Sequence, residues 1–178
     1  NNIIAIHSSA NIISSVSMLA CAKLGITHCV LFEDLSKEAI QVRLKLLKSK
    51  ILITAADIES YNLKIINQKG IKKITFFNKK NKFNIDLKNF LSNRNYSSYN
   101  FEYTNVKSNK PFFVLFTSGT TGIPKGIVHS TAGYLVYTKY TCVEQFGMNK
   151  DTVMLTASDA GWMNGHTYAL YGPLLMGA

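Results

Sequence analysis

The chain has 178 residues, of which 47% are hydrophobic, enough for one domain with a real core or for a piece of a larger one. No apolar run approaches the roughly 20 residues that a membrane-spanning helix needs, and the first residues lack the basic flank and apolar core of a signal peptide. Lysine and arginine outnumber aspartate and glutamate by 20 to 10, which favours anionic ligands or simply a surface solvated by lysines.

The first third of the chain alternates apolar runs with amphipathic ones. Residues 3–7 and 27–32 predict two buried strands, and residues 10–24 between them predict a helix capped by Ser8 or Ser9. Ser36 predicts the cap of a second helix.

The same alternation continues along the chain. Residues 51–54 and 71–77 predict two further strands, separated by a short helix near residues 57–68. Strands that alternate with helices imply parallel strands joined by crossovers. The expected fold class is therefore α/β, with a parallel or mostly parallel sheet covered by helices.

Residues 78–109 depart from this pattern. They are rich in asparagine and lysine, carry irregularly spaced aromatic residues and show no sustained period, so we expect a long surface connection with at most one helical turn. A basic stretch with interleaved aromatic residues could also stack on single-stranded nucleic acid, which keeps a non-catalytic binding module as an alternative.

Regular structure resumes at Pro111. Residues 111–117 predict a buried strand, residues 129–147 a helix, and residues 151–158 another strand.

The cysteines form no C-x-x-C pair and are interpreted as small, reduced, buried side chains of an intracellular protein; the scattered histidines predict no metal site. The cysteines are Cys21, Cys29 and Cys142, and the histidines are His7, His28, His129 and His166.

The sequence "FTSGTTGIPKGIVHS", residues 116–130, joins the strand predicted at 111–117 to the helix predicted at 129–147. Its glycines allow tight turns and close approach of backbone N–H groups to an anion, its hydroxyls add donors, and Lys125 supplies a mobile positive charge. It is not the loop G-x-x-x-x-G-K-[ST], because Pro124 and Gly126 stand where that motif needs glycine and a hydroxyl. We interpret it as a polyphosphate cradle rather than a plain surface turn.

This loop resembles the phosphate loop of the adenylate-forming enzymes, which include acyl-CoA synthetases, luciferases and peptide-synthetase adenylation domains. The later sequence "SDAGWMNGHTYALYGPLLMGA" is similar to that of the AMP-forming short-chain acyl-CoA synthetases, the acetyl- and propionyl-CoA synthetase group. "VSMLACAKLGITHCVLFEDLSKEAIQVRL" agrees, although Glu33 and Asp34 stand where relatives have two glycines. The resemblance is good over residues 3–57 and 110–178.

The resemblance implies a ligase that uses ATP, Mg²⁺ and coenzyme A. A carboxylate and ATP would give an acyl-adenylate and pyrophosphate, and the thiol of coenzyme A would then displace AMP. Lys125 would be the catalytic cation that neutralises pyrophosphate. The expected phosphate-binding residues are Thr117, Ser118, Gly119, Thr120, Thr121, Gly122, Lys125 and Gly126.

The segment after residue 158 would supply the acyl pocket and the coenzyme A side. The resemblance implies a short acid, with acetate as the first choice and propionate as the second. Met163 and Asn164 depart from the small valine or threonine residues of the family: a longer methionine could shrink the pocket, and an asparagine could offer a new hydrogen bond. An adenylate-forming ligase for a longer or branched acid remains an alternative. The expected residues are Trp162, Met163, Asn164, Gly165 and His166.

Because the chain starts at Asn1 and the family's later motifs are absent, we expect residues 1–178 to be part of the large N-terminal domain of such an enzyme. The C-terminal domain would be missing, and the fragment alone would be inactive. The expected partners are a small carboxylate, ATP and coenzyme A, with neither nucleic acid nor membrane. The expected location is the cytoplasm.

Overall fold

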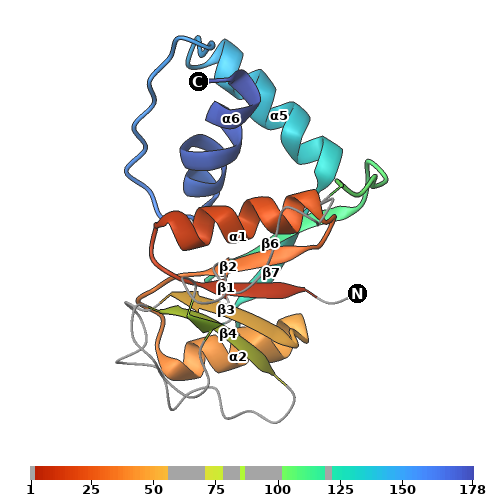
Figure 1. Ribbon diagram of the computed structural model, residues 1–178, viewed down its shortest axis with the longest axis vertical. Coiled ribbons are helices and arrows are strands. Elements are labelled where there is room, and N and C mark those ends of the chain that lie inside the picture. Colours follow the sequence, from red (N-terminus) through yellow and green to blue (C-terminus); the bar gives the residue numbers. More distant parts are fainter. Residues whose placement is uncertain (1–2, 56–70, 78–84, 87–101, 119–121) are drawn as a thin grey trace. The chain divides into compact units, whose positions relative to one another are not determined.

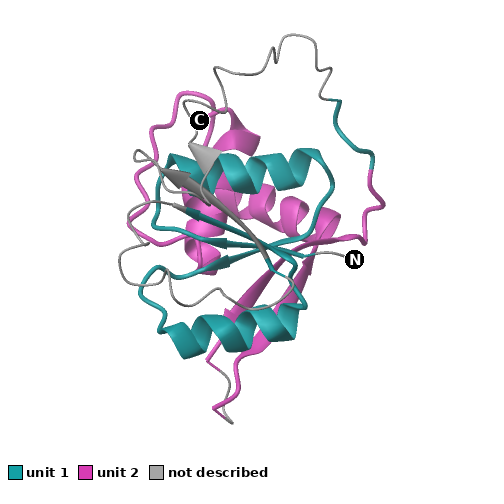
Figure 2. Cartoon of the chain, turned by 60° about the horizontal axis from the view of Figure 1, so that its bottom comes forward, with its two compact units in different colours: residues 1–105 teal, residues 106–178 magenta. Residues whose placement is uncertain are grey.

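The computed structural model describes residues 3–55, 71–77, 85–86, 102–118 and 122–178. The chain divides into two compact units, residues 1–105 and 106–178 (Figure 2). The helix predicted at 57–68 and most of the predicted surface connection at 78–109 lie outside the described residues. Each unit is an α/β or mixed structure with its own core.

The first unit is built on a parallel sheet. Within the described residues its strand order is β5-β4-β3-β1-β2, and every neighbouring pair is parallel. Ala5 of the central strand lies opposite Cys29 on one side and Leu52 on the other. The strands are β1 (Ile4–His7), β2 (His28–Leu31), β3 (Ile51–Ala55), β4 (Lys72–Phe77) and β5 (Ile85–Asp86).

Helices α1 (Ile12–Lys23) and α2 (Lys37–Leu47) cover opposite faces of this sheet (Figure 1). The chain leaves β1 for β2 on one side and then returns across β1 to form β3. Because crossovers between parallel strands are right-handed, reversing the direction of travel moves the second helix to the other face. The predicted α/β class with a parallel sheet is confirmed.

The cap of α1 differs from the prediction. The helix begins two residues later than expected, and its cap is Asn11, whose Oδ1 accepts hydrogen bonds from the N–H groups of Ile13 (2.9 Å) and Ser14 (3.1 Å). Ser8 and Ser9 bond to the Asn11 side chain instead and so orient the cap. The asparagine is favoured because its carbonyl reaches two free helix N–H groups. The predicted Ser36 cap of α2 is confirmed by its bond from Ala39 N–H.

The core of the first unit joins the strands to one face of each helix. Burial raises the pKa of the Cys21 and Cys29 thiols to about 12, so both stay protonated. Together with the buried, free Cys142 of the second unit, they confirm the interpretation of the cysteines as small buried side chains. The other core residues of this unit include Ala5, Ile6, Met18, Val30, Leu31, Ile40, Leu44, Leu47 and Leu52.

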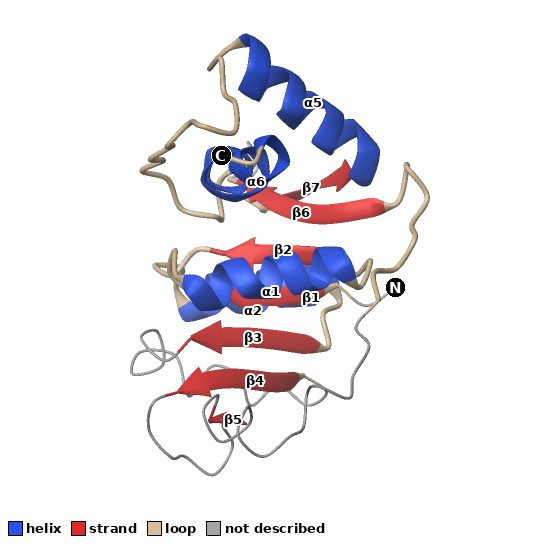
Figure 3. Cartoon of the chain, turned by 45° about the horizontal axis from the view of Figure 1, so that its top comes forward, coloured by secondary structure: helices blue, strands red, loops and turns tan. Residues whose placement is uncertain are grey.

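The second unit combines an antiparallel hairpin with helices (Figure 3). Strand β6 (Pro111–Thr117) pairs with β7 (Lys125–Ser130), and helix α5 (Thr131–Glu144) follows directly. A π-helical segment, η4 (Gly165–Tyr171), runs into the short helix α6 (Gly172–Met176). None of the helices in the described part of the chain is long and apolar enough to cross a membrane.

The helix predicted at residues 129–147 is confirmed as α5 with shorter bounds, because residues 129–130 belong to the strand that pairs with β6. The strand predicted at residues 151–158 is wrong, because this segment has no regular secondary structure. Its Val153 and Leu155 side chains are 98% and 91% exposed, and it is attached through the Thr156 hydroxyl to the Tyr168 carbonyl at 2.8 Å.

Lys48 ends α2 in the left-handed conformation, with φ of 50°. This conformation is strained for a residue with a Cβ, so Lys48→Gly should raise the free energy of unfolding by about 1 kcal/mol. Lys45→Gly, inside the same helix, is the matched control and should lower it by about 1 kcal/mol. Chemical denaturation of both variants checks this; a loss of stability in Lys48→Gly would contradict it.

Candidate functional site

The Gly- and hydroxyl-rich sequence forms the loop of the β6–β7 hairpin. Thr117 ends β6 directly opposite Lys125, which begins β7, and the Thr117 hydroxyl donates a 3.5 Å hydrogen bond to the Lys125 carbonyl. Both residues are exposed, so the side chains at the base of the loop are accessible. Of the other predicted phosphate-binding residues, Ser118 and Gly122 are exposed, and residues 119–121 lie outside the described residues.

Gly122 and Gly126 are glycines for two different structural reasons. Gly122 has φ of 77°, a left-handed conformation that glycine adopts without strain. Gly126 lies within β7, where a Cβ would come within 3.0 Å of Val114 Cγ1 and 3.4 Å of Phe116 Cε1. Close packing of the hairpin therefore explains Gly126, which was predicted as a phosphate-binding residue.

A tight turn presents the predicted acyl-site residues. The Oδ1 atom of Asp159 accepts a 2.6 Å hydrogen bond from Gly161 N–H, and its backbone carbonyl accepts one of 3.0 Å from Trp162 N–H. At Gly165 a Cβ would overlap the Asp159 carbonyl and come within 2.8 Å of Ala160 N. The two ends of the turn are thus pressed together, and this fixes the direction in which the residues between them point.

The turn encloses one side of a cavity of about 400 Å³. Three of its lining residues, Trp162, Met163 and Asn164, were predicted from the sequence as acyl-site residues, and the structure brings them together. The fourth, Ser158, was missed. Ser158 directly precedes the Asp-x-Gly sequence. Such a sequence predicts a turn that folds the chain back on itself, and this could have indicated that Ser158 lies near residues 162–164.

Gly165 and His166 lie beside the cavity and not among the lining residues found in the described part of the chain. Both are buried. His166 Nδ1 donates a hydrogen bond to the Ala160 carbonyl, which connects η4 to the turn. The pKa of His166 is lowered to about 4, mainly by burial; the bond to Ala160 opposes the shift and the neighbouring His129 adds to it. The ring is therefore neutral at pH 7.

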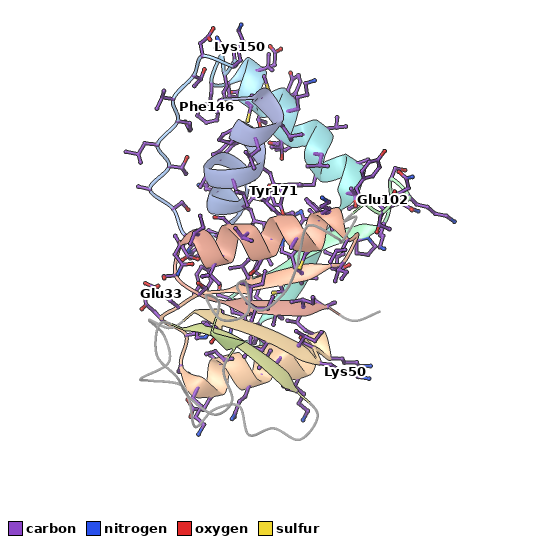
Figure 4. All side chains as sticks on the ribbon, in the orientation of Figure 1. Glu33, Lys50, Glu102, Phe146, Lys150 and Tyr171 are labelled. Carbon is purple, nitrogen blue, oxygen red and sulfur yellow. The ribbon has the colours of Figure 1, made fainter. Side chains whose placement is uncertain are left out.

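Phe113 connects the hairpin to the turn through an aromatic cluster. Its ring is fully buried and lies 4.6 Å from His129 of β7, 4.6 Å from Tyr134 of α5 and 4.4 Å from His166 of η4, measured between centroids. Tyr171, labelled in Figure 4, extends the cluster along η4. The Tyr134 hydroxyl also donates to Thr167 Oγ1 at 3.1 Å. The β6–β7 hairpin and the cavity turn are therefore parts of one packed unit.

The sequence profile of the family described as AMP-binding enzyme matches residues 1–178. The chain belongs to the AMP-binding enzyme family. This confirms the membership predicted from the hairpin loop and from the sequence around Trp162. Among the described residues, no three histidine, cysteine or acidic side chains gather into a cluster that could hold a metal ion.

Individual AMP-binding enzymes agree with this placement. The chain is 36% identical over 192 residues to acetyl-coenzyme A synthetase 2 of Debaryomyces hansenii, a match that covers 98% of the chain and 28% of that relative. Acetyl-coenzyme A synthetase 1 of Saccharomyces cerevisiae is 35% identical, covering 91% of the chain and 25% of its own length. Acetyl-coenzyme A synthetase of Helicobacter pylori is 35% identical, and the match covers 90% of the chain and 27% of that relative. The chain spans about a quarter of the length of these relatives.

Gly165→Ala should destabilise the second unit, because the added methyl group overlaps backbone atoms of Asp159 and Ala160 that cannot rotate away. We expect a loss of about 3 kcal/mol in the free energy of unfolding. The control is Gly133→Ala, where the added Cβ meets only the Ser130 Oγ atom and a change within about 1 kcal/mol is expected. Equal stability of the two variants in thermal unfolding would refute the tight turn.

His166 should make stability depend on pH. Its folded pKa of about 4 lies below the unfolded value of 6.5, so the unfolded chain binds a proton that the folded one excludes. Stability should therefore fall as the pH is lowered through this window, by up to about 1.4 kcal/mol per unit. Denaturation from pH 7 to pH 4 should show a smaller slope in His166→Asn than in His129→Asn. Identical slopes would argue against a buried neutral His166.

Proposed function

We propose that the protein activates a short-chain carboxylate with ATP and transfers the acyl group to coenzyme A. In the first step a carboxylate oxygen attacks the α-phosphorus of ATP, and pyrophosphate leaves as the acyl-adenylate forms. In the second step the thiol of coenzyme A attacks the acyl carbon and AMP leaves. Support comes from membership of the AMP-binding family and from the relatives named acetyl-coenzyme A synthetase.

The observation that carries the proposal is the presence of two features in one packed unit. The exposed residues Thr117, Ser118, Gly122 and Lys125 on the two sides of the hairpin loop suit a polyphosphate, and a cavity of about 400 Å³ suits a small organic ligand. The cluster around Phe113 holds the hairpin and the turn that lines the cavity in a fixed arrangement. Adenylation needs such an arrangement, because the acid must meet the α-phosphorus in line.

The loop would bind MgATP through its β- and γ-phosphates. Backbone N–H groups at glycines and the hydroxyls of Thr117, Ser118, Thr120 and Thr121 would donate hydrogen bonds to phosphate oxygens. Lys125 begins β7, so its backbone is fixed by the hairpin while its long side chain is exposed to solvent. It would neutralise the charge that develops on the departing pyrophosphate.

The cavity would receive the acyl group. Trp162 and Met163 supply apolar walls, and Met163 is long enough to shorten the space available to an acyl chain. Acetate is therefore the first candidate substrate and propionate the second. Gly165 and His166 would act indirectly, by holding the turn against η4. A selective response to acids longer than butyrate would favour the alternative of a ligase for longer or branched acids.

Lys125→Ala should slow adenylation in the full-length protein by about 100-fold, a typical loss when one group that stabilises developing charge is removed. The measurement is carboxylate-dependent exchange of labelled pyrophosphate into ATP. Lys139→Ala, at another exposed lysine on α5, is the matched control and should retain the wild-type rate. Unchanged exchange in Lys125→Ala would show that this lysine does not act on the phosphates.

A further inference from the structure

Of the described residues that line the cavity, Ser158 and Asn164 are polar and offer hydrogen-bonding groups. Within the described residues, neither the Ser158 hydroxyl nor the Asn164 amide has a hydrogen-bond partner, although both residues face the same cavity. Asn164 directly precedes η4, yet its side chain makes no capping bond there. Both groups are therefore available to a ligand.

The backbones of Ser158 and Asn164 are held in place by the turn. Ser158 is partly buried and directly precedes Asp159, whose side chain and carbonyl close the turn. Asn164 directly precedes Gly165, whose Cα is pressed against that same carbonyl. Both polar residues therefore flank the closed ends of one turn, and their backbones are held in place.

The other half of the lining is apolar. Trp162 is 61% exposed and contributes an indole ring, and Met163 contributes a flexible thioether. None of the lining residues in the described part of the chain carries a charge. Such a site suits a ligand with a small apolar body and one neutral hydrogen-bonding group, and it disfavours a second carboxylate, which would have no compensating cation there.

We propose that this site also activates short carboxylic acids that carry a hydroxyl group, with Ser158 and Asn164 binding that hydroxyl. This inference rests on the proposed function and extends it from acetate and propionate to their hydroxylated counterparts, glycolate and 3-hydroxypropionate. The hydroxyl takes no part in the reaction. A carboxylate oxygen still forms the new bond to the α-phosphorus, the bond from that phosphorus to pyrophosphate breaks, and pyrophosphate departs.

The chemistry of the two side chains matches a hydroxyl group. A hydroxyl has one donor and two acceptor positions, while the asparagine amide offers both a donor and an acceptor and the serine hydroxyl can act as either. A site that hydrogen-bonds a substrate hydroxyl discriminates against the analogue that lacks it, because its polar groups lose partners. In this site the loss is moderated by exposure of Asn164 to water.

The test uses pyrophosphate exchange by the full-length protein with acetate and glycolate, and with propionate and 3-hydroxypropionate. The quantity compared is the ratio of kcat/KM for each hydroxy acid to that for its plain counterpart. We expect ratios of at least about one in the wild type, and a fall of at least about tenfold in Asn164→Val and in Ser158→Ala. Ser108→Ala, an exposed serine outside the cavity lining, is the matched control and should keep the wild-type ratio.

The outcomes separate this inference from the proposed function. Exchange with acetate or propionate but none with the hydroxy acids would overturn the inference and leave the proposed function standing. Equal ratios in the wild type and both cavity variants would also overturn it. Exchange with none of the four acids would count against the proposed function itself, and the inference would fall with it. Thermal unfolding of each variant confirms that a changed ratio is measured on folded protein.

Discussion

The arrangement of the site depends on the burial of Phe113. This ring is in contact with His129 from the partner strand, Tyr134 from α5 and His166 from η4, so three elements that follow one another along the chain converge on one side chain. The ring fixes the strands of the hairpin, while Thr117 and Lys125 at the loop end of the strands remain exposed. Aromatic contacts of this kind add stability beyond the area they bury.

A second constraint is the close approach at Asp159 and Gly165. The turn closes only because position 165 has no side chain, and closing it directs Trp162, Met163 and Asn164 outward while His166 enters the core. Gly165 thus connects the exposed cavity residues to the Phe113 cluster. Substitutions at the buried His166 can therefore affect the cavity without touching a ligand.

The sequence predicted most of the fold of the first unit. Strands β1 to β4 coincide with short apolar runs, and helix α2 begins after a serine cap. These elements could be predicted because they depend mainly on residues that are close in sequence. One error arose where a residue's structure depends on a distant partner: residues 129–130 were assigned to a helix but form a strand because β6 lies beside them. Another was local: α1 begins two residues later than the apolar pattern suggested, so Asn11 and not a serine is its cap.

The candidate site was predicted less evenly. Trp162, Met163 and Asn164 were proposed because their sequence resembles that of a family, and they line one cavity; Ser158 also lines it but was not proposed, because its place there depends on how the turn folds. Gly126 was interpreted as part of an anion cradle, whereas contact with Val114 explains it sterically. The role of a residue that contacts a sequence-distant neighbour cannot be predicted from the spacing of residues along the chain.

The measurement that tests the central claim most directly is exchange of labelled pyrophosphate into ATP by the wild-type full-length protein. It should be run with acetate, propionate and butyrate in parallel and without coenzyme A. The account predicts exchange that requires an added short acid and declines toward butyrate. Exchange that is absent with every acid, or that proceeds equally without any acid, would contradict the assignment of the hairpin loop and the cavity to one adenylation site.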